Sequence, residues 1–143
     1  MIVWITGASS GIGEACALEY ALKGASLILT SRSEDKLASV ARRCLEKGAS
    51  NVTILPYDLE DPSGIEILSD NAWSTFGKID VLFCNAGVSQ RTTVEETSME
   101  TVRKLMEINY FAPVEMTKAI LPRMVAAGGG AIAVTSSIAG YFG

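Results

Sequence analysis

Five short apolar runs, separated by longer segments of helical periodicity, constrain this fold more than any other feature. Within each run the apolar residues are consecutive, a pattern typical of strands buried on both faces of a parallel sheet. Between the runs, apolar residues recur three and four positions apart, as in amphipathic helices. The predicted strands are residues 2–6, 26–30, 52–55, 81–85 and 131–135. The alternation predicts βαβ units, and therefore an α/β fold with a doubly wound parallel sheet.

The same pattern predicts helices over residues 12–23, 34–47 and 65–76, and a longer one before the fifth strand. The longer helix opens with Thr97-Ser98-Met99-Glu100, a capping-box pattern. Pro113 and Pro122 interrupt it, so we expect a kink or break near residues 109–113.

Composition excludes several classes of function. The 143 residues fit a single domain. The chain has no histidine, so it cannot contain a Ser-His-Asp or Cys-His nucleophile system or a His-ligated catalytic metal, and no metal site is expected. A net charge of −4 argues against nucleic acid as a partner.

Compartment and membrane signals point to a cytoplasmic chain. Cys16, Cys44 and Cys84 are odd in number and form no CxxC pair, which indicates reduced thiols in a cytosol-like compartment. No apolar run approaches the ~18 residues of a membrane span. The sequence after Met1 lacks the basic region of a signal peptide, although an anchor upstream of Met1 stays open.

A glycine-rich turn follows the first apolar run. Thr6 is followed by Gly7-Ala8-Ser9-Ser10-Gly11-Ile12-Gly13 and then by a helical pattern, the strand–turn–helix context of a phosphate site. Glycines let backbone N–H groups approach a pyrophosphate, and a helix N-terminus adds about half a positive charge. A purely structural turn is the alternative, but this context favours a dinucleotide. The candidate contacts are Gly7, Ser9, Ser10, Gly11, Ile12 and Gly13.

This GxxxGxG spacing differs from GxGxxG and from the P-loop. With Thr6 it matches TGxxxGxG, the fingerprint of the short-chain dehydrogenase/reductase family, and the chain resembles that family. Residues 87–91 and the opening Val-Trp-Ile-Thr-Gly are most similar to its member-seven-like branch, which contains carbonyl reductases of steroid- and retinoid-like substrates. The resemblance implies a Rossmann-like sheet of order 3-2-1-4-5. Residues 1–143 would then be one NAD(P)-binding domain, incomplete at its C-terminus.

The end of the second strand predicts which dinucleotide binds. An acid about 20 residues after the glycines would bind the 2′-hydroxyl of NAD. This chain has Ser31-Arg32 there instead, and a guanidinium pairs with a 2′-phosphate that a carboxylate would repel. We therefore expect NADP(H) in preference to NAD(H). The alternative is a solvated arginine at the start of the next helix.

Two further strand ends resemble cofactor contacts of the family. Asp58-Leu59, closing the third strand, is similar to the adenine-contacting pair. The fourth strand closes with Cys84-Asn85-Ala86-Gly87, which is similar to the family's NNAG motif. Cys84 replaces the first asparagine, and we expect this position to be buried and to serve packing. The resemblance implies that Asn85 steadies the sheet, while Ala86 and Gly87 let the backbone lie against the cofactor ribose.

The resemblance also implies catalytic residues. Ser137, after the fifth strand, matches the serine that hydrogen-bonds the substrate oxygen, and Asn109 matches the asparagine that holds a water in the proton relay. In relatives a YxxxK motif follows the serine by just over a dozen residues; its lysine lowers the pKa of the tyrosine, which acts as general acid/base. The sequence ends at Gly143, and Tyr141 is too close to Ser137 to be that tyrosine. Residues 1–143 alone are therefore expected to be inactive.

These resemblances imply an NADP-dependent oxidoreductase that transfers a hydride between nicotinamide and a carbonyl or secondary alcohol. The full-length protein would be a homodimer or homotetramer, as in the family. One alternative is a non-catalytic NADP-binding module, or a truncated product, without the tyrosine and lysine. Another is a methyltransferase, which would favour an acid where Ser31 stands.

Overall fold

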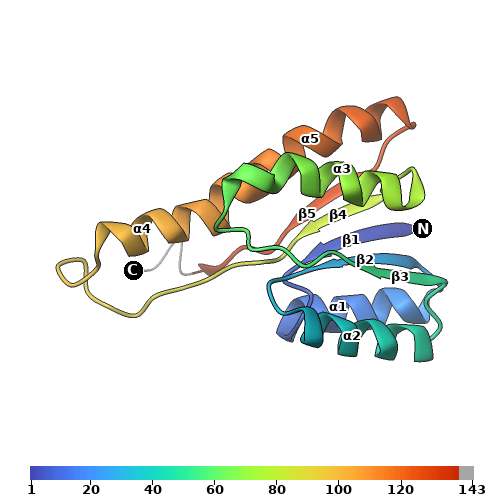
Figure 1. Cartoon of the computed structure of the whole chain (residues 1–143), viewed down its shortest axis with the longest axis horizontal. Helices are drawn as coiled ribbons and strands as arrows, with labels where there is room; N and C mark the ends of the chain where they lie inside the picture. The colour runs from blue at the N-terminus through green and yellow to red at the C-terminus, as the bar shows by residue number, and fades with distance from the viewer. Residues whose placement is uncertain (139–143) are drawn as a thin grey trace.

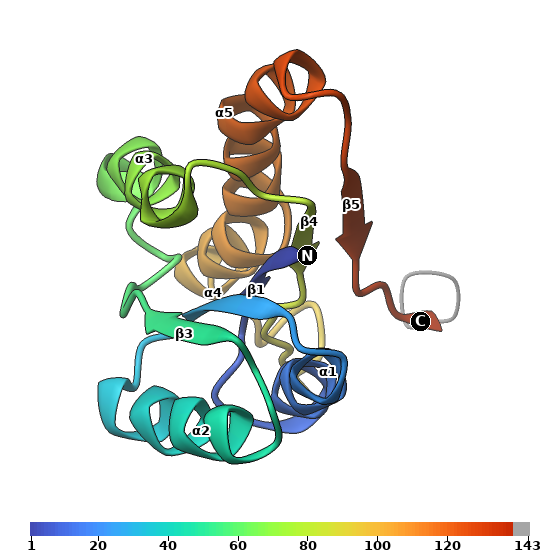
Figure 2. The ribbon, with the colours of Figure 1, turned by 90° about the vertical axis from the view of Figure 1, so that its right-hand side faces the viewer.

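A computed structural model describes residues 1–138, and Tyr141 lies outside that range. The strands are β1 (Ile2–Thr6), β2 (Ser26–Thr30), β3 (Asn51–Ile54), β4 (Val81–Cys84) and β5 (Ala131–Val134). They form one parallel sheet in the order β3-β2-β1-β4-β5, so the predicted fold class and strand order are confirmed. Figures 1 and 2 show the sheet between two layers of helices.

The two faces of the sheet carry separate cores. In β1 the consecutive residues Val3, Trp4 and Ile5 are fully buried, because helices cover both faces. Val3 and Ile5 pack on the side of α1 (Gly11–Leu22) and α2 (Glu34–Glu46). Trp4 packs on the side of α3 (Ile65–Phe76) and α5 (Ala112–Ala126). The buried β1 therefore fixes the position of the glycine turn that follows it.

The third, fourth and fifth strands each end one residue earlier than the sequence pattern predicts. β3 ends at Ile54, so Asp58 and Leu59 lie in the loop beyond it rather than closing the strand. β4 ends at Cys84, which places Asn85 just outside the sheet. A short 3₁₀ turn, η1 (Pro62–Gly64), connects the loop after β3 to α3. Both candidate segments thus lie in loops at the carboxyl edge of the sheet.

The long helix is broken, as predicted, but by a turn of π-helix. α4 (Met99–Met106) leads into η2 (Glu107–Phe111), and α5 follows without a gap. Pro113 occupies the first turn of α5, directly after η2, so its missing N–H falls inside a continuous run of helix. It cannot donate the α-helical hydrogen bond to the carbonyl of Asn109, which explains why regular helix geometry fails there.

Two predictions about this helix are wrong in detail. Pro122 lies inside α5 without ending it. Because proline has no N–H, the carbonyl of Lys118 lacks its helical donor, but both residues are exposed and water can reach that carbonyl. The N-cap is Ser98, whose side chain accepts from the N–H of Thr101 at 3.1 Å. The expected Thr97–Glu100 capping box does not form, because the Thr97 hydroxyl instead donates to the carbonyl of Thr93.

Among residues 1–138, no helix is both long enough and apolar enough to cross a membrane.

Candidate cofactor site

The loops that follow β1, β2 and β4 meet at the carboxyl edge of the sheet. The strand order reverses between β1 and β4, and ligands of doubly wound folds bind at such a switch point. The glycine turn follows β1, Ser31 and Arg32 follow β2, and residues 85–87 follow β4. Figure 1 shows α4 extending past the same edge. The sheet thus brings together segments that are distant in sequence.

The three glycines of the turn are each required by geometry. Gly7 and Gly11 have φ values of 65° and 58°, which side-chain-bearing residues adopt only with strain. A Cβ at Gly7 would lie 2.8 Å from Cα of Ala86, and one at Gly13 would lie 2.4 Å from the carbonyl oxygen of Gly7. The turn therefore packs directly on the loop after β4 and on the first turn of α1.

The N-terminus of α1 is open toward this turn. Ser10 is the N-cap in extended conformation, but its side chain caps no N–H of the helix. The first-turn N–H groups and the helix dipole can therefore bind an anion such as a pyrophosphate. Glu14, the one acid of the first turn, forms an ion pair with Arg43 of α2, which offsets its negative charge. Ile12 is 59% exposed at the mouth of the turn, next to exposed Gly11 and half-buried Ser9.

The buried hydroxyl of Thr6 joins β1 to the loop after β4. It accepts hydrogen bonds from the backbone N–H groups of Asn85 and Ala86, both at 3.1 Å. The side-chain amide of Asn85 donates to the carbonyls of Thr6 and Gly7 at 3.2 and 3.4 Å. Asn85 Oδ1 accepts from the hydroxyl of Thr135, after β5, at 2.9 Å. Asn85 thereby links the ends of three strands.

Ser31 and Arg32 form a polar corner at the end of β2. Ser31 Oγ is buried and has no hydrogen-bond partner among the described residues, as a position built for an additional acceptor would be. Arg32 is exposed and forms no ion pair within residues 1–138. The carbonyl of Ser31 accepts from the N–H of Tyr57 at 3.0 Å, which ties this corner to the loop after β3. An orphaned hydroxyl beside an unpaired guanidinium fits a phosphate group.

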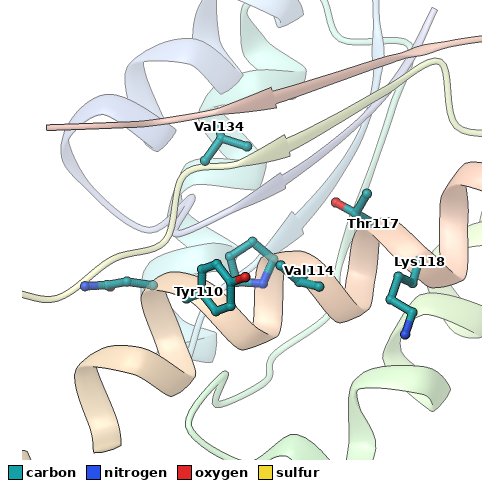
Figure 3. Close-up of a pocket in the computed structure, with 7 residues that line it drawn as sticks. Tyr110, Val114, Thr117, Lys118 and Val134 are labelled. Carbon is teal, nitrogen blue, oxygen red and sulfur yellow. The ribbon is translucent and has the colours of Figure 1, made fainter. Parts of the chain in front are cut away.

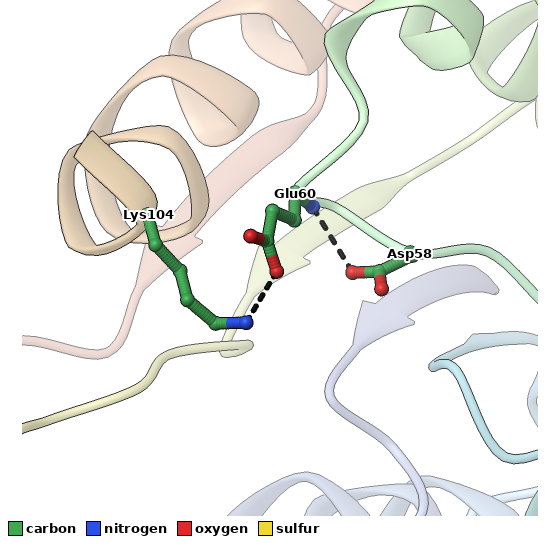
Figure 4. Close-up of polar contacts among 3 residues, drawn as sticks. All are labelled: Asp58, Glu60 and Lys104. Atoms are coloured by element: carbon green, nitrogen blue, oxygen red, sulfur yellow. Dashed lines mark hydrogen bonds and ion pairs between the residues drawn. The ribbon is translucent and has the colours of Figure 1, made fainter. Parts of the chain in front are cut away.

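Asp58 and Leu59 point in different directions on that loop. Leu59 is 6% exposed and belongs to the core on the α3 and α5 side. Asp58 is exposed, and its Oδ1 accepts from the backbone N–H of Glu60 at 3.1 Å. Glu60 in turn forms an ion pair with Lys104 of α4, as Figure 4 shows. No spacing pattern in the sequence predicts the ion pair between Glu60 and Lys104.

The Asn109 side chain contacts the loop after β4. Its Oδ1 accepts from the N–H of Val88 at 2.9 Å, and its Nδ2 donates to the carbonyl of Val88 at 2.8 Å. The side chain is therefore occupied by backbone. The missing N–H of Pro113 leaves the backbone carbonyl of Asn109 without its α-helical donor.

Asn109 also lines a pocket between the long helix and β5. The pocket has a volume of about 250 Å³, and its other lining residues are Tyr110, Pro113, Val114, Thr117, Lys118 and Val134. Figure 3 shows the helix residues on one side and Val134 of β5 on the other. Ser137 follows β5 by three residues and is exposed. The pocket wall is mostly apolar, which suits the carbon skeleton of a small molecule.

Cys84 is buried, as predicted, with 3% of its surface exposed. Burial raises the pKa of its thiol from 9.0 to about 11, so the thiol is protonated at neutral pH and is a poor nucleophile. Within the described part of the chain, no three His, Cys, Asp or Glu side chains gather in a way that could hold a metal ion.

Sequence comparison identifies relatives of this chain. Residues 1–143 match the family model described as short chain dehydrogenase. Dehydrogenase/reductase SDR family member 7 of Mus musculus and of Homo sapiens are each 43% identical over 143 residues. Each match covers 98% of this chain but 42% of the relative, so the chain spans less than half the length of these proteins.

Solved structures that are similar to this chain also include short-chain dehydrogenases. A short-chain dehydrogenase from Sphingobium yanoikuyae in complex with NADPH has a TM-score of 0.89 and 32% identity, over 99% of this chain and 55% of that one. The L-sorbose reductase of Gluconobacter frateurii, complexed with NADPH and L-sorbose, has a TM-score of 0.91 and 36% identity, over 96% and 52%. The resemblance inferred from the TGxxxGxG motif is confirmed, and the chain belongs to the short-chain dehydrogenase family.

Proposed function

We propose that this chain is the cofactor-binding half of an NADP(H)-dependent oxidoreductase that acts on a carbonyl or secondary alcohol. One observation carries the proposal: the open N-terminus of α1, the orphaned Ser31 hydroxyl and the unpaired Arg32 guanidinium lie at one edge of the sheet. Together they offer two sites for anions, one for a pyrophosphate and one for a 2′-phosphate.

We assign the contacts of the cofactor as follows. The N–H groups of the turn from Gly7 to Gly13, other than that of Ala8, bind the pyrophosphate with the hydroxyls of Ser9 and Ser10, and Ile12 shields it. The Ala8 N–H instead donates to the carbonyl of Thr30 at 3.2 Å. Ser31 and Arg32 bind the 2′-phosphate, and Arg32 makes NADP(H) the preferred cofactor because a guanidinium pairs with phosphate at two points. The Asp58 carboxylate and the backbone of Leu59 hold the adenine, because the Leu59 side chain is buried in the core. Asn85, Ala86 and Gly87 lie against the ribose.

In the reaction, bound nicotinamide supplies or accepts the hydride. Ser137 donates a hydrogen bond to the substrate oxygen, and the backbone carbonyl of Asn109 holds a water of the proton relay. Tyr20, Tyr57 and Tyr110 are followed four positions later by Gly24, Asp61 and Val114 rather than by lysine. We therefore place the tyrosine and lysine, with the remaining strands of one NAD(P)-binding domain, in the part of the full-length protein outside these 143 residues. The 143-residue piece alone would then be inactive.

The relatives support this assignment. Solved neighbours of 32–36% identity are complexed with NADPH, and one of them is a reductase of a sugar ketone, L-sorbose.

The test uses the full-length protein, the longest natural form that contains these residues. We expect it to oxidise NADPH in the presence of a reactive ketone or aldehyde. Ser137→Ala should abolish turnover while NADPH still binds, and the neighbouring Ser136→Ala is the matched control that keeps most activity. Binding of NADPH with no turnover of any carbonyl or alcohol would instead favour a non-catalytic binding module. Binding of S-adenosylmethionine without NADPH would favour a methyltransferase.

A further inference from the structure

Glu60 connects Asp58 to the long helix. Its backbone N–H donates to Asp58 Oδ1 at 3.1 Å, and its carboxylate forms an ion pair with the ammonium group of Lys104. Figure 4 shows the three side chains in this order, with Glu60 in the middle. Lys104 lies 44 residues away in sequence, on α4. The contacts thus tie the loop after β3 to a helix that leads into Asn109.

The loop itself is fixed at several other points. The N–H of Tyr57 donates to Ser31, and the N–H of Asp61 donates to the carbonyl of Asp58, both at 3.0 Å. The Tyr57 hydroxyl accepts from the N–H of Gly64 at 2.9 Å and donates to the carbonyl of Asp61 at 2.5 Å. These contacts fix the loop on both sides of Glu60 but involve no atom of Glu60 itself. By contrast, the Glu60–Lys104 ion pair reaches α4.

Asp58 presents a fixed acceptor to solvent. Its Oδ1 is engaged by Glu60, whereas Oδ2 has no hydrogen bond to any residue between 1 and 138. Under the proposed function this carboxylate faces the adenine of the cofactor. The exocyclic amino group of adenine donates hydrogen bonds, whereas hypoxanthine has a carbonyl oxygen at the same carbon. A carboxylate held in place accepts from the first and repels the second.

We propose that Lys104, acting through Glu60, is a positioning residue that holds Asp58 against the base of the cofactor and so selects adenine over hypoxanthine. This rests on the proposed function, because it requires that NADP(H) binds at this edge. The Lys104 and Glu60 side chains are 40% and 41% exposed, and ion pairs this exposed add little to folding stability. The effect of the pair is therefore expected in base selectivity rather than in stability.

The experiment compares two ligands in the full-length protein. NADPH and its hypoxanthine analogue are titrated against wild type, Lys104→Met and Asp58→Ala. We expect wild type to prefer NADPH and Asp58→Ala to lose that preference. Lys104→Met should reduce the preference by a factor of about five, the loss equivalent to one exposed charged contact. Affinity for the analogue should not fall, because a less firmly held Asp58 repels its carbonyl oxygen less.

A matched control and a double mutant separate positioning from general damage. Lys78→Met removes a similar ion pair, Lys78–Asp80 at 2.7 Å, next to the opposite ends of the strands; the Lys78 side chain is 44% exposed. It should leave the preference as in wild type. In an Asp58→Ala background, Lys104→Met should have no further effect, because both changes act on the same contact.

Three results would overturn the positioning role of Lys104: an unchanged preference in Lys104→Met, an equal loss in Lys78→Met, or an unchanged preference in Asp58→Ala. In each case wild-type binding of NADPH would leave the proposed function standing. If wild type binds neither dinucleotide, the proposed function itself is contradicted, and the positioning role falls with it.

Discussion

Asn109 holds the peptide of Val88 at both of its polar atoms, accepting from the N–H at 2.9 Å and donating to the carbonyl at 2.8 Å. An amide can do both because it carries one acceptor and one donor group, whereas a carboxylate carries acceptors alone. The π turn at residues 107–111 presents the side chain to the loop after β4. These two bonds join Asn109, a proposed catalytic residue, to the loop after β4, whose residues 85–87 are the proposed ribose contacts.

Asn109→Asp should impair turnover in the full-length protein. The carboxylate keeps the bond from the Val88 N–H but sets an acceptor against the Val88 carbonyl, which moves the loop. We expect kcat to fall by about tenfold or more, the cost of one lost hydrogen bond and an added repulsion. Affinity for NADPH should change less. Asn71→Asp on the surface of α3 is the control, and equal kcat values for the two variants would contradict this role.

Gly11→Ala and Gly24→Ala form a matched pair. Both glycines have positive φ, 58° and 69°, and a Cβ at either would meet no atom within 4 Å. Each substitution should destabilise the fold by about 1–2 kcal/mol through backbone strain. Only Gly11 lies in the proposed pyrophosphate turn, so only Gly11→Ala should weaken NADPH binding. Equal NADPH dissociation constants, measured by titration, would show that the turn does not bind the cofactor.

Thr6→Val should destabilise the protein, because it leaves the N–H groups of Asn85 and Ala86 without their acceptor. The expected cost is about 1–3 kcal/mol in the free energy of unfolding, measured by chemical denaturation. Thr6→Ser keeps the hydroxyl and is the control, expected to lose less. NADPH affinity should fall with Thr6→Val, since Asn85 also supports the carbonyl of Gly7. A Thr6→Val protein as stable as Thr6→Ser would contradict the hydrogen-bond network.

The two buried thiols predict a loss of stability at alkaline pH. Burial raises the pKa of Cys44 and of Cys84 from 9.0 to about 11. Between these values the unfolded chain releases thiol protons that the folded chain keeps, so the free energy of unfolding falls as pH rises from 9 to 11. Cys84→Ala should flatten this fall when unfolding is measured across that range. An identical slope in Cys84→Ala and wild type would argue against the shift.

The alternation of apolar runs was sufficient to predict the fold, because strands buried on both faces leave a strong pattern. Val3, Trp4 and Ile5 are apolar and fully buried, and the glycine turn after them needs no longer-range information. The N-cap of α4 was predicted one residue too early, since Thr97 and Ser98 are both good caps and only the backbone conformation decides between them.

Contacts between distant segments were beyond the sequence pattern. Thr6 bonds Asn85 across 79 residues, and Thr135 bonds Asn85 across 50. Threonines at strand ends are common, and their partners follow only from knowing that β4 lies between β1 and β5. Glu60 and Lys104 carry no spacing signal at all, because a loop and a helix meet there. The sequence predicts which strand ends form the edge, while side-chain packing decides which groups pair across it.

The central claim is that Arg32 binds a 2′-phosphate, and Arg32→Asp tests it in the full-length protein. NADPH and NADH are titrated against wild type, Arg32→Asp and Arg42→Asp, a control with the same charge change in the C-terminal half of α2. Wild type and Arg42→Asp should prefer NADPH, whereas Arg32→Asp should prefer NADH, because its carboxylate repels the phosphate and accepts from a free 2′-hydroxyl. An NADPH-to-NADH affinity ratio that is the same in all three proteins would contradict the account.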